Sequence, residues 1–267
     1  MNKIIRNVFF AGAAYAAYEN ICALSVRREE LGGDIKAVQI SDLHKRSFGK
    51  DNSRLIGKVA DERPDVIFIT GDLVSRDETD LMKAKKLVEK LCRIAPVYMI
   101  YGNHEKSLPR KKYLELGCML RNTDVILLQN ESSVFTKNGR KIVIYGLSEK
   151  YSTYKKNDSY RDLDRLDKAE LESLMGKCPD GEDVILLAHN PLFGSAYAEW
   201  GAEKTFSGHV HGGAVRLFGK GILSPERKFF PKYSKGIYTI GRMKLLVSAG
   251  LGKLRLFDPP EIVVYYI

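Results

Sequence analysis

Five short polar clusters, each directly after an apolar run of strand length, constrain this chain more than any other feature. An apolar run that stops at polar side chains is typical of a buried strand ending in a functional loop. In sheets with parallel strands, ligand sites lie at the carboxyl ends of the strands, so five such loops can meet at one place. The clusters, each with its preceding run, are Ser41–His44 (Ile35–Ile40), Gly71–Asp72 (Val66–Thr70), Gly102–Glu105 (Val97–Tyr101), His189–Pro191 (Val184–Ala188) and Gly208–His211 (Lys204–Phe206).

The histidines of the chain are confined to these clusters. The chain has five of them, and each lies beside an Asp, an Asn or another histidine: His44, His104, His189, His209 and His211. A single histidine after a strand is more often structural than functional, but five placed in this way indicate a site. Side chains two apart in an extended strand point the same way, so Asp42-x-His44 and His209-x-His211 are each expected to present two ligands.

The donor set predicts a metal centre with two ions. Imidazole mixed with carboxylate suits Mn, Fe or Zn better than metals that prefer thiolates. Seven nitrogen and oxygen donors exceed what one tetrahedral zinc accepts, whereas two divalent ions roughly 3.5–4 Å apart can use them all. The seven predicted ligands are Asp42, His44, Asp72, Asn103, His189, His209 and His211.

The rest of the body alternates between helices and strands, which favours an α/β layered sheet. Helical spacing covers Asn52–Ala60, Thr79–Cys92 and Tyr160–Met175. Strand-like runs at Val125–Leu128 and Lys141–Gly146 flank an Asn-Gly turn at residues 138–139. Ile237–Ile240, Lys244–Val247 and Ile262–Tyr266 are expected as short strands with more antiparallel pairing. Without a Ser/Gly/Pro-rich linker in the body, we expect one domain over residues 25–267 and a separate N-terminal segment over residues 1–24.

The N-terminal segment is apolar and is expected to be helical. Its uninterrupted run, Val8–Tyr18, is 11 residues long, and a bilayer span needs roughly 20. A basic start followed by an apolar run and small residues also resembles a signal peptide. We predict a helix that contacts the membrane surface, with a removed export signal as the alternative. The four cysteines form no CxxC pair, which is typical of a reducing compartment. We therefore expect the helix to contact the cytoplasmic face of the membrane.

The positive charge is concentrated in one stretch. Between residues 214 and 257 ten basic residues face one acid, Glu226, so this stretch carries +9 of the net charge of +10. Such a field favours an anionic partner, and Arg216 is near enough to the last cluster to help bind a phosphate. Within Ile222–Tyr238, basic and aromatic residues alternate, which suits a membrane interface as well as an ordinary surface loop. No nucleic-acid-binding motif accompanies the charge, so we do not expect nucleic acid as the partner.

In order and spacing, the five clusters resemble the motif set of the calcineurin-like metallophosphoesterases over about residues 35–267. The runs Thr205–Gly213, Ser248–Gly252 and Pro260–Ile262 resemble the bacterial membrane-associated phosphodiesterases of the YkuE/YaeI type. The resemblance implies a layered sandwich of two mixed β-sheets flanked by helices. It also implies a hydrolase with two divalent metal ions, manganese among the candidates.

The resemblance assigns a role to each site residue. Asp42, His44 and His211 would bind the first metal, Asp72 would bridge, and Asn103, His189 and His209 would bind the second. His104 would be the catalytic histidine, protonating the leaving oxygen or stabilising the transition state, with Glu105 as its orienting partner. A metal-bridging hydroxide would attack phosphorus in line. Many family members carry an acid where Ser75 stands here.

The expected reaction is therefore metal-dependent hydrolysis of a phosphodiester or pyrophosphate of a lipid- or nucleotide-linked substrate at a membrane surface. A soluble phosphodiesterase or protein phosphatase with the same two-metal chemistry is the alternative. A non-catalytic scaffold usually shows lost ligands, and none is lost here. The sequence indicates neither the substrate itself nor the oligomeric state.

Overall fold

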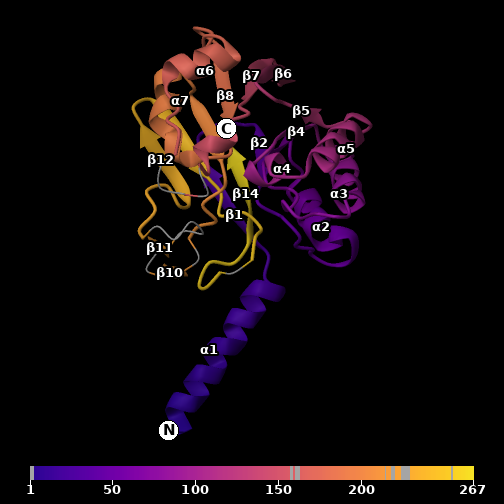
Figure 1. Ribbon diagram of the computed structural model, residues 1–267, viewed down its shortest axis with the longest axis vertical. Helices are drawn as coiled ribbons and strands as arrows, with labels where there is room; N and C mark the ends of the chain where they lie inside the picture. The colour runs from indigo at the N-terminus through magenta and orange to yellow at the C-terminus, as the bar shows by residue number, and fades with distance from the viewer. Residues whose placement is uncertain are drawn as a thin grey trace.

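Two six-stranded mixed sheets form the body of the protein in a computed structural model (Figure 1). The structure describes residues 3–156, 159, 163–213, 215–217, 220–223, 229–253 and 255–267. The first sheet, in spatial order, is β1 (Ser25–Glu30), β14 (Glu261–Tyr266), β2 (Lys36–Ile40), β3 (Val66–Thr70), β4 (Val97–Ile100) and β5 (Ile126–Leu127). The second is β12 (Gly236–Ile240), β13 (Met243–Val247), β9 (Lys204–Ser207), β8 (Asp183–Leu187), β7 (Arg140–Gly146) and β6 (Glu131–Lys137). A two-stranded ribbon joins β10 (Val215–Leu217) to β11 (Lys220–Leu223). The predicted α/β sandwich is confirmed.

Side chains from both sheets meet in a common buried layer. Strand β3 reads Val-Ile-Phe-Ile-Thr and is buried at every position, as expected for a strand covered on both faces. Val66 and Phe68 face the second sheet, where Phe68 packs edge to face on Phe206 of β9 with ring centroids 4.8 Å apart. Ile67 and Ile69 face the opposite way, toward helices. The continuous apolar runs in the sequence therefore reflect burial on two sides.

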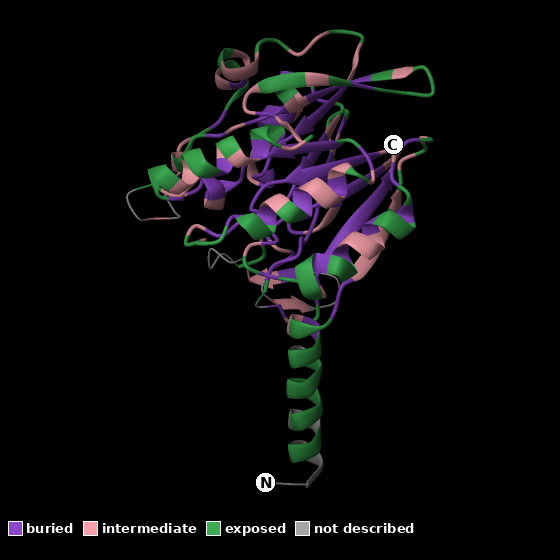
Figure 2. Cartoon of the chain, turned by 90° about the vertical axis from the view of Figure 1, so that its right-hand side faces the viewer, coloured by how far each residue is buried: buried purple, intermediate pink, exposed green. Residues whose placement is uncertain are grey.

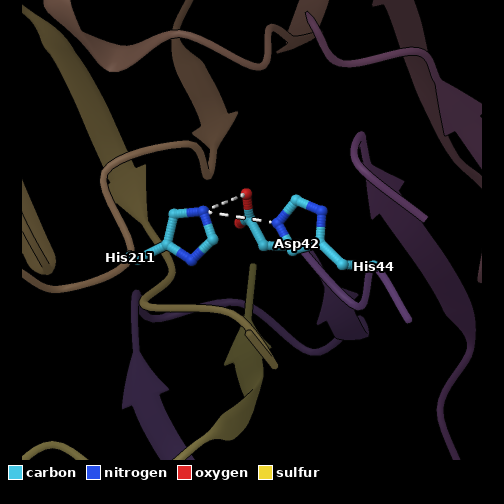
Figure 3. Close-up of side chains that lie close together, drawn as sticks. All are labelled: Asp42, His44 and His211. Atoms are coloured by element: carbon cyan, nitrogen blue, oxygen red, sulfur yellow. Dashed lines mark hydrogen bonds and ion pairs between the residues drawn. The ribbon is translucent and has the colours of Figure 1, made fainter. Parts of the chain in front are cut away.

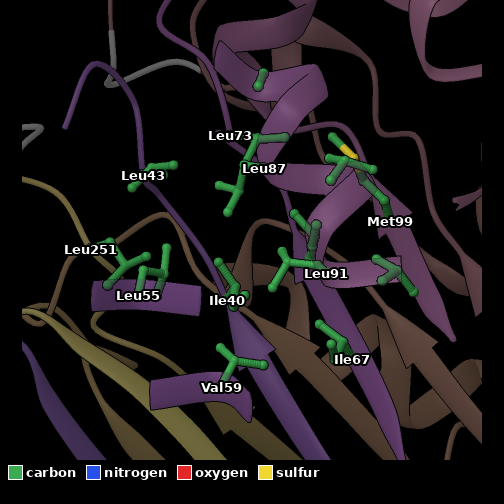
Figure 4. Packing of buried hydrophobic residues seen from close by; sticks show 14 of the residues in the cluster. Ile40, Leu43, Leu55, Val59, Ile67, Leu73, Leu87, Leu91, Met99 and Leu251 are labelled. Carbon is green, nitrogen blue, oxygen red and sulfur yellow. The ribbon is translucent and has the colours of Figure 1, made fainter. Parts of the chain in front are cut away.

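Helices cover the outer face of each sheet. α2 (Ser53–Glu62), α3 (Met82–Cys92) and α5 (Arg110–Arg121) pack on the first sheet, and Figure 4 shows Leu55, Val59, Leu87 and Leu91 against Ile40, Ile67 and Met99. α6 (Lys168–Met175) and α7 (Gly194–Trp200) pack on the second sheet. The short helices are α4 (Asn103–Lys106) and the single 3₁₀ turns Lys50–Asn52, Tyr151–Thr153 and Pro191–Phe193.

Helix α1 (Lys3–Ile21) extends away from this body (Figures 1 and 2). Most of its described side chains are exposed, among them Phe10, Tyr15 and Tyr18. Over the described residues, no helix combines the length and the apolar character needed to cross a bilayer. The expected helix is present, and β1 begins at Ser25, immediately after the predicted boundary at residue 24.

Two expectations about secondary structure were wrong, and one strand was not predicted. The helix predicted over Tyr160–Met175 begins only at Lys168, because Asp167 caps it by accepting a hydrogen bond from the backbone N–H of Glu170 (2.9 Å). Residues 160–162 lie outside the described residues. The Asn-Gly turn joins β7 to β6, whereas β5, from the predicted run Val125–Leu128, pairs with β4 in the other sheet. Strand β1, rich in charged residues, lacks the apolar alternation that would have predicted it.

Candidate metal centre

The carboxyl ends of parallel strands from both sheets meet at one place. β2, β3 and β4 run parallel in the first sheet, and β7, β8 and β9 run parallel in the second. Asp42 follows β2, Asp72 follows β3 and Asn103 follows β4, while His189 and His209 follow β8 and β9. The seven predicted ligand residues thus lie in segments that follow these strands, six in loops and Asn103 at the start of α4.

Three of these residues form what we call the first half-site: Asp42, His44 and His211 (Figure 3). The Nε2 atom of His211 lies 3.4 Å from Oδ1 of Asp42 and 3.4 Å from Nε2 of His44. The two imidazole rings are stacked, with centroids 5.2 Å apart and planes 3° apart. These atoms face one another closely enough to share a cation.

The second half-site consists of Asp72, His189 and His209, with Asn103 as the fourth ligand that the resemblance implies. The ligand atoms of Asp72, His189 and His209 lie within 4.8 Å of one another. Nε2 of His189 is 3.3 Å from Oδ2 of Asp72 and 3.9 Å from Oδ1 of Asp42. Oδ2 of Asp72 is also 3.9 Å from Nε2 of His44. Asp72 therefore lies between the two half-sites, where a bridging carboxylate is needed.

The backbone reaches this arrangement through left-handed conformations. Asp42, His44, Asp72, His209 and His211 have φ values of 55°, 53°, 54°, 70° and 54°. A non-glycine residue in this region costs on the order of 1–3 kcal/mol, and such residues cluster at functional sites. The sequence argument assumed that Asp42-x-His44 and His209-x-His211 lie in extended chain, and this was wrong. The paired ligands converge because each loop turns sharply after its strand.

Two buried atoms test whether a metal fits here. Nδ1 of His189 lies 2.6 Å from the carbonyl oxygen of Thr70, a contact that fixes the proton on Nδ1 and leaves Nε2 facing the site. Nε2 of His189 and Oδ1 of Asn103 are buried and have no hydrogen-bond partner in the described part of the chain. Buried polar atoms that form no hydrogen bond fit metal ligands, and Nε2 of His189 faces the carboxylate of Asp72.

The charges of the site also favour a cation. Burial opposes a charged imidazole at His189, yet the adjacent carboxylates of Asp72 and Asp42 raise its pKa to about 10. Burial raises the pKa of Asp42, and the neighbouring Asp72 acts in the same direction. Two buried carboxylates this close therefore need positive charge between them.

Glu105 supports the loop of Asp72 and was assigned the wrong partner. We expected it to orient His104, but its carboxylate accepts hydrogen bonds from the backbone N–H groups of Asp72, Val74 and Gly102 at 2.8–2.9 Å. Burial raises the pKa of Glu105 to about 7, with the nearby Asp72 adding to the effect. Glu105 thus fixes the backbone on both sides of the bridging residue.

His104 contacts Arg76, a residue that the sequence analysis did not single out. The Nη2 atom of Arg76 is 2.9 Å from Nε2 of His104, and the backbone nitrogen of Arg76 is 3.2 Å from Nδ1. The guanidinium and the backbone N–H of Arg76 can only donate hydrogen bonds, whereas a neutral imidazole accepts a hydrogen bond at only one of its two nitrogens. Burial lowers the pKa of His104 to about 4, so the ring is neutral at pH 7. For Nε2 to donate a proton, the guanidinium of Arg76 must move aside.

Tyr154 covers the second half-site. Its buried ring lies edge-on to His209, with centroids 5.0 Å apart, and 5.9 Å from the ring of His189. Burial and the carboxylate of Glu149 raise the pKa of its phenol. Lys106, which follows the Asn-His-Glu cluster, bonds to the Glu149 carbonyl oxygen and lies over the Tyr154 ring at 5.9 Å. No sequence motif marked Tyr154, because it lies in a loop between β7 and α6.

Arg216 lies on β10, beyond the last cluster. Its Nη1 atom donates to the carbonyl oxygen of Gly212 at 3.1 Å and lies 3.5 Å from Oγ of Ser234. Arg216 therefore contacts the end of the His209–His211 loop, and its role in substrate binding stays a prediction.

The fold and this donor set define a metal-dependent phosphoesterase, and comparison with known proteins gives the family. Residues 35–213 match the model of the calcineurin-like phosphoesterases, and the chain belongs to this family. Metal-dependent hydrolysis of a phosphoester follows as its activity, as predicted.

Several relatives match most of the chain. An uncharacterised metallophosphoesterase of Campylobacter jejuni is 28% identical over 99% of this chain and 68% of its own length. Phosphodiesterase YaeI of Escherichia coli is 25% identical over 86% of this chain and 80% of its own. The UDP-2,3-diacylglucosamine pyrophosphatase LpxG of Chlamydia muridarum is 24% identical over 86% and 82%. A phosphopantetheinyl hydrolase from Mycobacterium tuberculosis shares the fold, with a TM-score of 0.54 at 14% identity over 84% of this chain and 92% of that one.

Proposed function

We propose that the chain hydrolyses a phosphodiester or pyrophosphate of a lipid- or nucleotide-linked substrate at a membrane surface, with two divalent ions. Two groups of ligand atoms carry the proposal, those of Asp42, His44 and His211 and those of Asp72, His189 and His209. Within each group the ligand atoms lie within 4.8 Å of one another. When bound, the ions would lower the pKa of a water molecule and offset the charge of the phosphate. Mn, Fe and Zn all suit this donor set.

The residues of the chain would divide the remaining work. Asp42, His44 and His211 would hold one ion, Asn103, His189 and His209 would hold the other, and Asp72 would be shared by both. With the backbone N–H of Arg76 on Nδ1, a neutral His104 carries its proton on Nε2 and donates a hydrogen bond to the leaving oxygen, which would stabilise the transition state. The guanidinium of Arg76 then turns from the imidazole to a phosphate oxygen, where its paired donors fit. Arg216 is a candidate for a second contact with the phosphate.

The membrane part of the proposal is supported by exposed rings at one end of the molecule. Phe10, Tyr15 and Tyr18 of α1 are exposed, and Phe257 stacks on Tyr15 with centroids 5.9 Å apart. Phe229 and Phe230, near the ribbon, are 73% and 67% exposed. Within the same basic and aromatic stretch, Tyr233 is buried, and Arg227 and Lys228 lie outside the described residues. Exposed rings next to a basic stretch suit an acidic lipid surface, which we propose to be the cytoplasmic face.

The LpxG relative is named as a pyrophosphatase of a diacylated nucleotide sugar, which supports a lipid-linked substrate. Export through a cleaved N-terminal signal is the alternative location. Cleavage of a signal is less compatible with the contacts of Glu19 and Asn20, since both residues form hydrogen bonds with residues of the body.

The chemistry is tested by a paired assay. The purified protein, loaded in turn with Mn²⁺, Zn²⁺ or Fe²⁺, is given bis-p-nitrophenyl phosphate and p-nitrophenyl phosphate. We expect the diester to be hydrolysed faster, and we expect activity to be lost in a chelator. Preference for the monoester would contradict the diesterase assignment, and activity without metal would contradict the mechanism.

Membrane contact is tested by sedimentation with vesicles. We expect binding to phosphatidylglycerol vesicles and weaker binding to phosphatidylcholine. The double variant Phe10→Ser, Tyr18→Ser should weaken binding by roughly tenfold or more, because each buried ring contributes about 1.5–3 kcal/mol. Leu114→Ser, at an exposed position on α5, is the matched control. Equal binding by the double variant and the control would favour a soluble enzyme.

A further inference from the structure

Near the C-terminal end of α1, Glu19 is buried and Asn20 is partly buried, whereas most of the described side chains before them are exposed. We call Glu19 and Asn20 the foot of α1. The side chain of Glu19 is 1% exposed and accepts a hydrogen bond from the backbone N–H of Phe257 at 2.8 Å. Figure 2 shows the exposed helix reaching the body only at this end. The foot is therefore part of the folded body, although the helix that precedes it is not.

Arg46 links the foot to a glycine-rich loop, residues 250–252. Its Nη2 atom donates to the carbonyl oxygen of Glu19 at 3.3 Å, and its Nη1 atom donates to the carbonyl oxygen of Gly252 at 2.8 Å. Arg46 is itself buried, and it lies two residues after His44. One guanidinium thus contacts α1, the glycine loop and the chain next to a predicted metal ligand.

Arg255 makes a second link of the same kind. Its backbone N–H donates to Oδ1 of Asn20 at 2.9 Å, and Nδ2 of Asn20 donates back to its carbonyl oxygen at 2.6 Å. Its side chain is buried, and Nε donates to the carbonyl oxygen of Gly252 at 3.0 Å. Asn20 and Arg255 therefore join the foot to the same loop without using Arg46.

The glycine loop lies directly against the first half-site. A Cβ atom on Gly252 would lie 2.6 Å from Nδ1 of His211, and one on Gly250 would lie 2.7 Å from Oδ2 of Asp42. The backbone N–H of Leu251 also bonds to the carbonyl oxygen of Ser41 at 2.9 Å. At these distances a small shift of the loop must move the ligands. This contact gives a physical reason for the run Ser248–Gly252, which the predicted chemistry did not use.

We propose that the foot of α1 is a structural part of the first half-site. Asn20, Arg46 and Arg255 are positioning residues that hold the glycine loop against Asp42 and His211. Loosening the foot lowers the affinity of the first half-site for its ion and leaves the second unchanged. The second half-site is supported elsewhere, by Tyr154 and Glu105. The inference rests on the two-ion site of the proposed function, but not on its substrate or on membrane contact.

The test measures metal binding without substrate. Mn²⁺ is titrated by calorimetry into His209→Ala, which keeps the first half-site, and into His211→Ala, which keeps the second. Asn20→Ala is then added to each. Removing the support of a metal ligand typically costs 10–100-fold in affinity. We expect a loss of about tenfold in the His209→Ala background and a change below about twofold in the His211→Ala background.

Asn138→Ala is the matched control, because this asparagine lies in the turn between β6 and β7, donates a hydrogen bond to Asp34 and belongs to neither half-site. Thermal unfolding shows whether each variant folds, and Asn20→Ser replaces Asn20→Ala if the latter does not. Unchanged affinity in the His209→Ala background would overturn the inference, and so would an equal loss in both backgrounds. A protein that binds Mn²⁺ normally but hydrolyses no phosphoester would contradict the proposed function and leave this inference standing.

Discussion

The two half-sites use similar ligands in different surroundings. In the first, the side chains of His44 and His211 are each 16% exposed, and their rings stack at the opening between loops. In the second, His189 is fully buried, and Tyr154 covers both imidazoles. The first half-site is supported from the side of α1, the second from the loop after β7. We therefore expect burial and support, as well as ligand type, to set how each half-site would hold and exchange an ion.

The largest effect is expected from the residue that both half-sites share. Asp72→Ala removes the bridging carboxylate and should lower activity roughly a thousandfold or more, since charge stabilisation by the ions is worth several kcal/mol. Metal analysis should show loss of bound metal. Asp77→Ala, an exposed aspartate in the same loop, is the control and should retain both activity and metal. Two tightly bound ions in Asp72→Ala would contradict the bridging role.

His104 belongs to neither half-site in the proposed mechanism. His104→Ala should lower kcat by roughly 10²–10⁴-fold, the range for loss of an acid–base group, while the metal content stays at that of the parent protein. Activity and metal content are measured on the same samples. Loss of one ion would instead make His104 a ligand, which the grouping of its ring with His44 and Asp72 allows geometrically.

The difference in burial predicts different exchange rates. When a chelator is added to the loaded protein, one ion should leave faster than the other, because the first half-site opens to solvent and the second does not. In His209→Ala only the fast phase should remain, and in His211→Ala only the slow phase. Release of both ions in a single phase from the parent protein would contradict the predicted difference between the half-sites. So would a slow phase in His209→Ala and a fast phase in His211→Ala.

Variants of Tyr154 test whether its ring, which covers the second half-site, causes the slow release of metal from that half-site. Tyr154→Ala should cost about 3–5 kcal/mol of unfolding free energy, as for other large buried rings, and should make the slow ion leave faster. Tyr154→Phe keeps the ring over His209 and should preserve the slow phase. If Tyr154→Phe behaved like Tyr154→Ala, the hydroxyl beside Glu149 would be the important group.

The smallest effect concerns pH and the support of the first half-site. Glu261 is buried and accepts a hydrogen bond from the backbone N–H of Ala249, next to the glycine loop. Although burial opposes its ionisation, Arg27 and Lys235 lower its pKa below the usual value of about 4.3. A carboxylate whose pKa is lower in the folded than in the unfolded state stabilises the protein at pH values above its unfolded-state pKa. This stability is lost as the pH falls through the folded-state pKa.

Stability should therefore fall on acidification below about pH 4.3, measured by denaturant unfolding across pH. Glu261→Gln should be less stable at pH 7, by about 3–5 kcal/mol for a broken buried pair, and should show a flatter profile between pH 5 and 3. Glu29→Gln, in the same region but more exposed, is the control. A profile of equal slope in Glu261→Gln would assign acid sensitivity to other groups.

The candidate ligands could be located from the sequence because their signal is local. Asp72 follows a run buried on both faces, and His209 and His211 follow another, so strand ends could be located from apolar runs alone. The left-handed turns that aim these side chains could not be predicted, since Asp and His adopt them only when the surrounding contacts fix them. Contacts between segments far apart in the sequence could not be predicted either. Arg76 meets His104, and Asn20 meets Arg255, only after folding.

The position of β14 has a consequence for how the protein is made. This strand lies between β1 and β2, so both N-terminal strands wait for a neighbour that the ribosome synthesises after every other strand described here. At 5–20 residues per second, the interval between α1 and β14 is on the order of ten to fifty seconds. During that time α1 has left the ribosome, but the loop that carries Asp42 has an incomplete sheet behind it. We therefore expect metal loading to follow translation, because a chain that ends before β14 would carry four of the seven predicted ligands, Asp42, His44, Asp72 and Asn103, after strands of an unfinished sheet.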